Sequence, residues 1–254
     1  MLKPERQNAI VTLVTKLDFA SVKQISEQLD VSEMTIRRDL EELAEVGRLT
    51  RVHGGARSIA GLHGTVARRE YTTSEKHQQH AIEKEQIAQT AARLVQDGDT
   101  VFLGAGTTCE ALARAIGNVH LRAITNSIQV FSALNECDTL DVILIGGEYR
   151  PNTGAFVGGI SERSIEAIGI SKAFVGTNGV HDGLIFGSNS LEGSLFRMAL
   201  NRADARYVVT DSSKIGKRDF YGFYDVVNLD GIVTDAAISE KQAKALSELT
   251  EVIF

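Results

Sequence analysis

The feature that most constrains the fold is a strand-then-helix pattern that recurs through the second half of the chain. Short apolar segments each run into a loop of small polar residues, and a helical segment follows. The apolar segments are residues 101–103, 122–124, 142–145, 173–175, 207–209 and 231–233. Strands that alternate with helices predict an α/β fold with an open, mostly parallel sheet. Because ligands of such sheets bind beyond the carboxyl ends of the strands, the loops after these segments form the expected ligand edge.

The N-terminal part of the chain follows a different pattern, which is typical of three short helices. Apolar residues from Ile10 to Leu17 have the spacing of one amphipathic helix. A second helix is expected to begin at Ser21, because Gln24 is correctly spaced to complete a capping box. Ser32 offers the N-cap of a third helix. Two short helices joined by a tight turn make a helix-turn-helix, whose second helix enters the major groove of DNA.

The outward face of the third predicted helix and the segment after it carry the candidate DNA-binding residues. Thr35 can contact a base edge or a thymine methyl group, and Arg37 and Arg38 can reach a phosphate or a guanine edge. Which of the two arginines contacts a base is left open. Residues 49–55 alternate between apolar and polar and end in two glycines, which predicts a β-hairpin wing. The DNA-binding residues predicted in this way are Ser32, Thr35, Arg37, Arg38, Arg51 and His53.

Charge and composition are those of a globular protein with one basic stretch. The chain has 254 residues and a formal net charge of −6, yet residues 48–69 hold five arginines and no acidic residue. Such a stretch favours contact with a polyanion such as DNA, with a basic, solvated linker as the alternative. No apolar run reaches the roughly 18–20 residues of a membrane span, and the N-terminus lacks the apolar region of a signal peptide. We therefore expect a cytoplasmic protein that does not contact a membrane.

The loop after the first predicted strand has the composition of a phosphate-binding turn. Residues 104–108 read Gly-Ala-Gly-Thr-Thr, and a helix is expected to follow. The backbone N–H groups, hydroxyls and helix dipole of such a turn suit an anion, although an ordinary helix N-cap has the same composition. Lys214 adds a cation on another loop. The residues predicted to bind an anionic, hydroxylated ligand such as a sugar phosphate are Gly104, Gly106, Thr107, Thr108, Thr125, Asn126, Gly147, Arg150, Asn178 and Lys214.

Both halves of the chain resemble the DeoR family of bacterial transcription regulators. The matching segments include residues 31–40 and 51–56 in the first half, and residues 99–108 and 211–214 in the second. The resemblance implies a DNA-binding repressor of a sugar-catabolism operon that needs no cofactor. It also implies an effector domain similar to ribose-5-phosphate isomerase that binds a phosphorylated sugar.

Further segments indicate a branch of that family. Residues 102–108, 146–150 and 212–217 resemble repressors of lactose phosphotransferase operons, which implies tagatose 6-phosphate as the effector. Residues 153–158 are also shared with repressors of fructose operons, which implies fructose 1-phosphate as the alternative. Many members have Asp at the position of Gly104, so any contact that this acid makes with a sugar hydroxyl is lost here.

The chain is expected to have three parts. They are a winged helix-turn-helix DNA-binding domain at 1–57, a linker at 58–80 and a sugar-phosphate-sensing α/β domain at 81–254. The helix-turn-helix predicts binding to double-stranded operator DNA as a homo-oligomer, either a dimer or a tetramer, with recognition helices about 34–36 Å apart. We expect a bound sugar phosphate to favour an arrangement in which these helices no longer match the operator.

Three other functions have less support in the residues. An isomerase of the similar fold needs an acid–base pair, but residues 176–180 contain no carboxylate, and Glu192 is better explained as an acid at a helix N-terminus. Cys109 follows a helix start that could lower its pKa, but core packing is the more common role of such a residue. His77 and His80 are expected to be exposed on a polar linker. The sequence therefore predicts no enzyme activity, no catalytic residue and no metal site.

Overall fold

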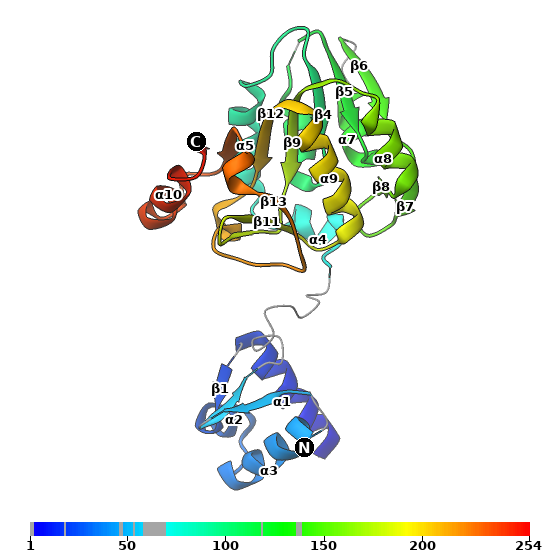
Figure 1. Cartoon of the computed structure of the whole chain (residues 1–254). Helices are drawn as coiled ribbons and strands as arrows, with labels where there is room; N and C mark the ends of the chain where they lie inside the picture. Colours follow the sequence, from blue (N-terminus) through cyan, green and yellow to red (C-terminus); the bar gives the residue numbers. More distant parts are fainter. Residues whose placement is uncertain are drawn as a thin grey trace. The chain divides into compact units, whose positions relative to one another are not determined.

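Figure 1 shows the computed structural model of the chain, which consists of two compact units. The structure describes residues 3–17, 19–45, 48–52, 54–57, 70–117, 119–135 and 139–254. The units are Met1–Arg68 and Arg69–Phe254. Each unit has a hydrophobic core of its own.

The first unit combines three helices with a small antiparallel sheet. Its helices are α1 (Lys3–Leu17), α2 (Val22–Leu29) and α3 (Glu33–Glu45). Its strands are β1 (Phe19–Ser21), β2 (Thr50–Val52) and β3 (Gly55–Arg57), in the order β1-β3-β2. The hairpin of β2 and β3 is the wing that the sequence predicts, whereas β1 is a third strand that the sequence analysis missed. The winged helix-turn-helix is therefore confirmed.

Side-chain caps set the turn between α2 and α3. The hydroxyl of Ser21 accepts a hydrogen bond from the backbone N–H of Gln24, whose side chain accepts one from the backbone N–H of Ser21. This is the predicted capping box. At the other end α2 stops at Asp30, which adopts a left-handed conformation with φ 52°. The hydroxyl of Ser32 then accepts from the N–H of Thr35 at 3.4 Å, as expected of the residue before α3.

A buried carboxylate ties α3 to α1. Asp39 is only 2% exposed, and it accepts hydrogen bonds from Nε of Arg6 at 2.6 Å and from Nη2 at 3.2 Å. Gln7 adds a longer contact of 3.4 Å to the same carboxylate. Because Asp39 directly follows Arg38 on α3, this ion pair fixes the rotation of the helix and so decides which side chains face outward.

The second unit is built on a seven-stranded sheet in which each neighbouring pair is parallel. The strand order is β15-β14-β12-β9-β4-β5-β6. The strands are β4 (Thr100–Leu103), β5 (Leu121–Thr125), β6 (Leu140–Leu144), β9 (Ile170–Gly176), β12 (Ala203–Val209), β14 (Gly231–Val233) and β15 (Glu251–Ile253). The first six contain the predicted strand segments, except that Ile145 of the segment 142–145 lies beyond the end of β6. The predicted open α/β sheet is confirmed.

Helices cover both faces of this sheet (Figure 1). They are α4 (Thr73–His77), α5 (Ala81–Ala92), α6 (Thr107–Ala115), α7 (Ile128–Leu134), α8 (Gly159–Glu166), α9 (Ser190–Arg202) and α10 (Glu240–Ser247). Phe102 belongs to the apolar cluster that includes residues of α8 and α9. Its neighbours Val101 and Leu103 belong to the cluster of α5, α6 and α7, because successive residues of a strand point to opposite faces. Among the described residues no helix is long and apolar enough to cross a bilayer.

Two small sheets and two short 3₁₀ turns complete the unit. The small sheets are the hairpin of β7 (Glu148–Arg150) and β8 (Ala155–Val157), and the three strands β10 (Gly179–His181), β11 (Leu184–Gly187) and β13 (Tyr221–Asp225). The 3₁₀ turns are Ser212–Lys214 and Val226–Asn228.

The order of the large sheet reverses at β4. From β4 the chain proceeds outward through β5 and β6, and it then returns to the other side of β4 at β9. The loops that follow β4 and β9 therefore border the point where the winding direction changes. Open α/β sheets bind ligands in the crevice at such a point.

We expect Asp39→Asn to destabilise the first unit by about 2 kcal/mol, because Arg6 would lose charge-assisted hydrogen bonds at a buried site. Faster amide hydrogen exchange in α1 and α3 of the full chain would report the loss. Glu33→Gln is the matched control, since Glu33 and its partner Arg37 are about half exposed and their pair contributes under about 1 kcal/mol. Equal effects of the two substitutions would contradict the assignment.

Candidate functional site

The outward face of α3 carries two exposed guanidinium groups. Arg38 is 83% exposed, and its Nε lies 3.9 Å from the carboxylate of Glu42. Arg37 is 55% exposed and donates to Glu33 at 3.4 Å. Ion pairs one turn apart on a helix surface contribute only a few tenths of a kcal/mol. Both arginines can therefore exchange these partners for a phosphate or a base edge.

Met34 is a further exposed residue of α3 that the sequence analysis did not select. Its side chain is 81% exposed at the start of the helix. The signal was present in the spacing, because Met34 falls outside the buried stripe of Ile36, Leu40 and Leu43. An apolar side chain at this place is suited to contact with a thymine methyl group.

The remaining predicted DNA-binding residues lie beside α3. The hydroxyls of Ser32 and Thr35 are 3.0 Å apart and share a hydrogen bond. Arg51 of β2 forms an ion pair with Glu41 of α3, which joins the wing to the recognition helix. His53 lies outside the described residues. Contact of these residues with DNA stays a prediction.

In the second unit, the start of α6 forms an open turn at the carboxyl edge of the sheet. Gly106 precedes the helix with φ 146°, and the space into which a Cβ would point is empty. Thr107 and Thr108 begin the helix, and no hydrogen bond between described residues uses their hydroxyl groups. An anion at this end of α6 would meet backbone N–H groups and two hydroxyls.

Two of the predicted ligand residues instead brace the loops around that turn. Asn126 is fully buried; its Oδ1 accepts from the N–H of Ala105 at 3.1 Å, and its Nδ2 donates to the carbonyl of Phe156 at 2.9 Å. The hydroxyl of Thr125 accepts from the N–H of Ser127 at 3.1 Å. These bonds hold the loops after β4 and β5 and the strand β8 to one another.

Gly104 and Gly147 are positions where a side chain has no room. A Cβ on Gly104 would lie 2.9 Å from the ring of Phe196. A Cβ on Gly147 would lie 2.1 Å from the hydroxyl of Ser161 and 2.6 Å from the carbonyl of Val157. Phe196 thus occupies the space that an acid at position 104 would need, and the floor of the site at this point is apolar.

A cluster of three lysines lies at the same edge, and only one of them, Lys214, is predicted from the sequence. Lys214 lies 3.8 Å from the carboxylate of Asp211. Lys84 of α5 is 8% exposed and donates from Nζ to the carbonyl oxygens of Lys76 and, at 2.6 Å, of Gln79. Lys76 of α4 donates to Oδ1 of Asn178 at 3.3 Å. The missed signal at Lys84 was its place on the apolar face of α5.

The environments of Lys76 and Lys84 lower the pKa of both side chains. Burial lowers the pKa of Lys76, and the nearby carboxylates, of which Glu192 is the first, oppose that shift. Burial also lowers the pKa of Lys84, with Asp211 opposing it. Lys214 lowers the pKa of both residues further, because its charge repels theirs. A bound anion would relieve this repulsion.

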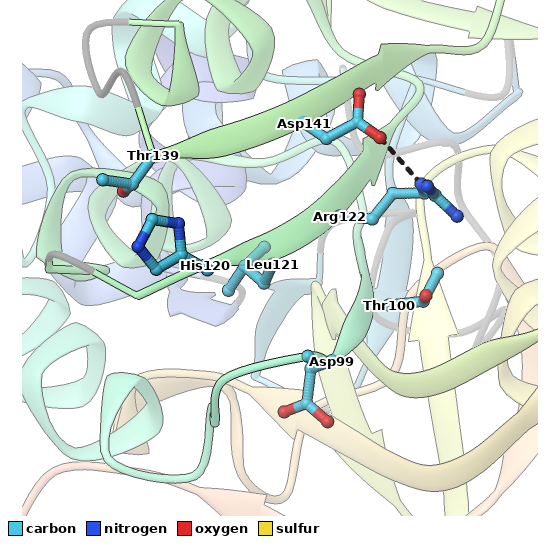
Figure 2. A pocket seen from close by; sticks show the side chains of 8 residues that line it. Asp99, Thr100, His120, Leu121, Arg122, Thr139 and Asp141 are labelled. Atoms are coloured by element: carbon cyan, nitrogen blue, oxygen red, sulfur yellow. Dashed lines mark hydrogen bonds and ion pairs between the residues drawn. The ribbon is translucent and has the colours of Figure 1, made fainter.

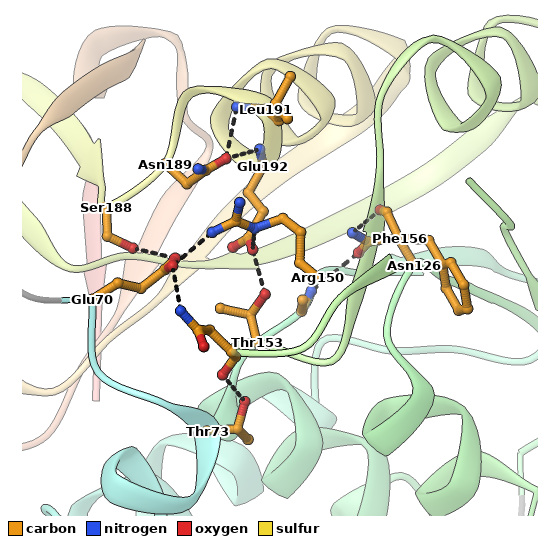
Figure 3. A network of polar contacts seen from close by, with 12 residues as sticks. Glu70, Thr73, Asn126, Arg150, Thr153, Phe156, Ser188, Asn189, Leu191 and Glu192 are labelled. Carbon is orange, nitrogen blue, oxygen red and sulfur yellow. Dashed lines mark hydrogen bonds and ion pairs between the residues drawn. The ribbon is translucent and has the colours of Figure 1, made fainter. Parts of the chain in front are cut away.

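Arg150 lies between two carboxylates at the β7–β8 hairpin (Figure 3). Its Nη2 donates to Glu70 at 2.6 Å, and its Nε donates to Glu192 at 3.0 Å. The hydroxyl of Thr153 also donates to Glu192. Glu192 does stand in the first turn of α9, as the sequence predicts, but its side chain is also the partner of Arg150 and Thr153.

Two cavities of about 320 Å³ lie on the second unit. The cavity of Figure 2 is at the amino ends of β4, β5 and β6, opposite the ligand edge. Its main charges are already paired, Arg122 with Asp141 at 2.9 Å and Asp99 with Lys172 at 2.7 Å. The other cavity adjoins Arg150 and is lined by the β7–β8 hairpin and Leu191. The second cavity is therefore the one that extends the candidate site.

Cys109 lies in the core of the second unit. Its side chain is fully buried, and its Sγ is 3.7 Å from the carbonyl oxygen of Phe174. Burial raises the pKa of the Cys109 thiol to about 12, so the possibility of a pKa lowered by the helix N-terminus was wrong. The packing role is confirmed.

His77 and His80 are both exposed, as the sequence predicts. His77 nevertheless contacts α6, since its Nε2 lies 3.0 Å from the carboxylate of Glu110. His80 lies 3.7 Å from Glu83. Within the described ranges, no three His, Cys, Asp or Glu side chains are placed to hold one metal ion.

Comparison with known proteins gives matches over both units. Residues 6–61 match the DeoR-like helix-turn-helix domain, and residues 79–236 match the DeoR C terminal sensor domain. A protein of Streptococcus mutans named lactose phosphotransferase system repressor is 43% identical over 100% of both chains. A protein of that name from Lactococcus lactis is 38% identical over 100% of this chain and 99% of its own. Another from Staphylococcus aureus is 40% identical over 95% of each chain. The resemblance inferred from the sequence motifs is confirmed.

Solved structures give weaker matches. Ribose 5-phosphate isomerase A of Methanocaldococcus jannaschii is 17% identical with a TM-score of 0.41, over 54% of this chain and 55% of that one. The eIF2B beta structure of Chaetomium thermophilum is 12% identical with a TM-score of 0.45, over 67% of this chain and 54% of that one. The matches thus span about half of those proteins.

Because the Cys109 thiol is buried, we expect the protein to lose stability at alkaline pH. The unfolded chain ionises Cys109 near pH 9.0, whereas the native thiol keeps its proton to about pH 12. Its contribution is therefore complete below pH 9.0 and declines as the pH rises toward 12, by about 1.4 kcal/mol per pH unit at most. Urea unfolding between pH 7.5 and 10.5 checks this, with Cys109→Ala as the control that lacks the titrating group. Parallel declines for both proteins would contradict the prediction.

Proposed function

The chain belongs to the DeoR family, and we propose that it is a DNA-binding repressor of a lactose phosphotransferase operon that acts in the cytoplasm. The full-length relatives of that name support the choice of operon. The observation that carries DNA binding is the pair of exposed guanidinium groups on α3, held outward by the buried Arg6–Asp39 pair.

Operator contact divides between α3 and the wing. Arg37, Arg38 and Thr35 contact bases and phosphates in the major groove, and Ser32 supports Thr35. Arg51 contacts the DNA backbone from the wing, together with His53 of the same segment. Two copies of the helix-turn-helix are needed to bind both halves of a symmetric operator, so the working species is a homodimer or a homotetramer.

The effector is an anionic sugar at the carboxyl edge of the sheet. Its phosphate binds at the N-terminus of α6, where Gly106, Thr107 and Thr108 provide N–H and hydroxyl groups. The three lysines of the cluster supply positive charge to the same region. The sugar hydroxyls extend toward Asn178 and the β7–β8 hairpin. Binding shifts the unit to a state with lower operator affinity, with a coupling of about 1–3 kcal/mol.

Tagatose 6-phosphate is the effector that fits the proposed lactose operon, and fructose 1-phosphate is the alternative. Both are ketohexose monophosphates, so both suit a site with one strong anion-binding end and a polar remainder. An acidic side chain at position 104 would require the ring of Phe196 to move, since a Cβ there would lie 2.9 Å from that ring.

An isomerase activity on the same edge has no support. The named relatives are repressors and not enzymes. The loop after β9 presents the amide of Asn178, which is held by Lys76. The carboxylate of Glu192 accepts from Arg150 and Thr153, and so serves as an ion-pair partner.

Arg38→Ala should weaken operator binding and reduce the salt dependence of that binding. If Arg38 neutralises a phosphate, the slope of log K against log salt should fall by about one unit. Fluorescence anisotropy with operator DNA over a range of salt concentrations measures both quantities. Lys23→Ala on α2 is the control, because Lys23 is an exposed lysine outside the recognition helix. Unchanged affinity and slope would remove Arg38 from the interface.

Lys214→Ala should abolish the response to the effector while leaving operator binding intact. A thermal-shift panel of tagatose 6-phosphate, fructose 1-phosphate, fructose 6-phosphate and ribose 5-phosphate identifies the ligand of the unaltered protein. The shift with that ligand should be lost in Lys214→Ala and kept in Lys241→Ala, which alters an exposed lysine of α10. If Lys214→Ala instead prevents operator binding without any sugar, the lysine is structural. If no sugar phosphate produces a shift, the proposed effector class is wrong.

A further inference from the structure

Residues 70–80, which the sequence assigns to a linker, are bound along the second unit, and we refer to them as the strap. Glu70 contacts the β7–β8 hairpin, and the backbone N–H of Thr73 donates to the carbonyl of Asn152 at 2.9 Å. Lys76 then reaches Asn178, and His77 reaches α6. The strap therefore touches several of the loops that surround the candidate ligand site.

Glu70, the first residue of the strap, has hydrogen-bond donors on both of its carboxylate oxygens. One carboxylate oxygen of Glu70 accepts from Arg150 at 2.6 Å and from Nδ2 of Asn152 at 3.3 Å (Figure 3). The other accepts from the hydroxyl of Ser188 at 3.0 Å. Glu70 is only 15% exposed, and charge-assisted hydrogen bonds of this kind are about twice as strong as neutral ones. Glu70 thus anchors the N-terminal end of the strap.

The C-terminal end of the strap is anchored by Lys84. The ammonium group of this buried lysine donates to the carbonyl oxygens of Lys76 and Gln79, both of which belong to the strap. Between the two anchors lies the side chain of Lys76, directed to Asn178 of the ligand edge. The strap therefore supplies one of the three lysines of the cluster.

We propose that Glu70 is a positioning residue for the ligand site, because the strap presents Lys76 to a bound anionic sugar only while Glu70 holds the strap in place. The inference rests on the proposed function, in that it takes the ligand to be an anionic sugar at this edge. Ligand binding and strap attachment then stabilise each other by the same free energy.

Through this coupling, ligand binding in the second unit can affect the rest of the chain. In the sequence the strap begins two residues after Arg68, the last residue of the first unit. A ligand that holds the strap down therefore fixes the chain two residues beyond the end of the first unit. The effector signal is then a change in strap attachment and requires no rearrangement of the sheet.

Substitution of Glu70 separates this proposal from direct charge repulsion. Glu70 carries a negative charge near the site, so if its direct repulsion of the ligand were all that mattered, Glu70→Gln would tighten the binding of an anionic sugar. The proposal requires the opposite sign. Glutamine cannot form the ion pair with Arg150, so the strap detaches more often and Lys76 is withdrawn from the site. We expect tagatose 6-phosphate to bind about tenfold more weakly, which corresponds to about 1.4 kcal/mol.

Two measurements on the full chain test the proposal. Calorimetric titration with tagatose 6-phosphate compares the unaltered protein, Glu70→Gln and Glu166→Gln, which alters an exposed glutamate at the end of α8. Of these three proteins, only Glu70→Gln should show faster amide hydrogen exchange in residues 71–80 when no ligand is present. Lys76→Gln should weaken binding to a similar extent, and the double substitution should add little, because Glu70 acts through Lys76.

The outcomes are distinct. Equal or tighter binding by Glu70→Gln, or a double substitution with fully additive effects, would overturn the proposal. Unchanged exchange of residues 71–80 in ligand-free Glu70→Gln would also overturn it, whatever the ligand. If the unaltered protein binds no sugar phosphate, the proposed effector fails on its own, and the exchange experiment still decides whether Glu70 holds the strap.

Discussion

The parallel arrangement of the large sheet is the constraint on which the second unit depends. Each parallel strand delivers its following loop to the same edge, so residues far apart in the sequence become neighbours there. Asn126 joins these loops by donating to one backbone segment and accepting from another, and it does so without exposure to solvent. The loops around the site are therefore held by hydrogen bonds within the protein itself. The groups left for a ligand are the open turn at Gly106, the hydroxyls of Thr107 and Thr108, and the mutually repelling ammonium groups of the lysine cluster.

Ion pairs withdrawn from solvent orient the functional groups in both units. In the first unit, Arg6 and Asp39 set the rotation of α3 and so leave the neighbouring Arg38 facing outward. In the second unit, Arg150 joins Glu70 of the strap to Glu192 of α9. In each case a partly or fully buried pair has fixed geometry, whereas the exposed pairs beside it are weak enough to exchange for a ligand.

Local sequence signals predicted the elements well where the information lay within a few residues. The capping box at Ser21, the hairpin wing and the alternation of strands and helices depend on near neighbours and on periodicity, and the structure contains them all. The short strands β1 and β15 went unpredicted, because three residues carry little periodicity and their pairing partners lie elsewhere in the chain. Cys109 shows a related limit: the sequence favoured core packing for this residue, but only the structure showed that its burial is complete and dominates its pKa.

The sequence by itself determined that this chain has a helix-turn-helix whose last helix exposes Arg37 and Arg38, and a glycine-rich turn at the edge of a parallel sheet. Both follow from the spacing of residues within one helix or one loop. Only the tertiary structure decided that Lys76 and Lys84 join Lys214, and that Glu70 and Glu192 share Arg150. Glu70 and Glu192 are separated from Arg150 by 80 and 42 positions. Contacts over such separations follow from the order in which strands assemble into the sheet, which no local pattern encodes.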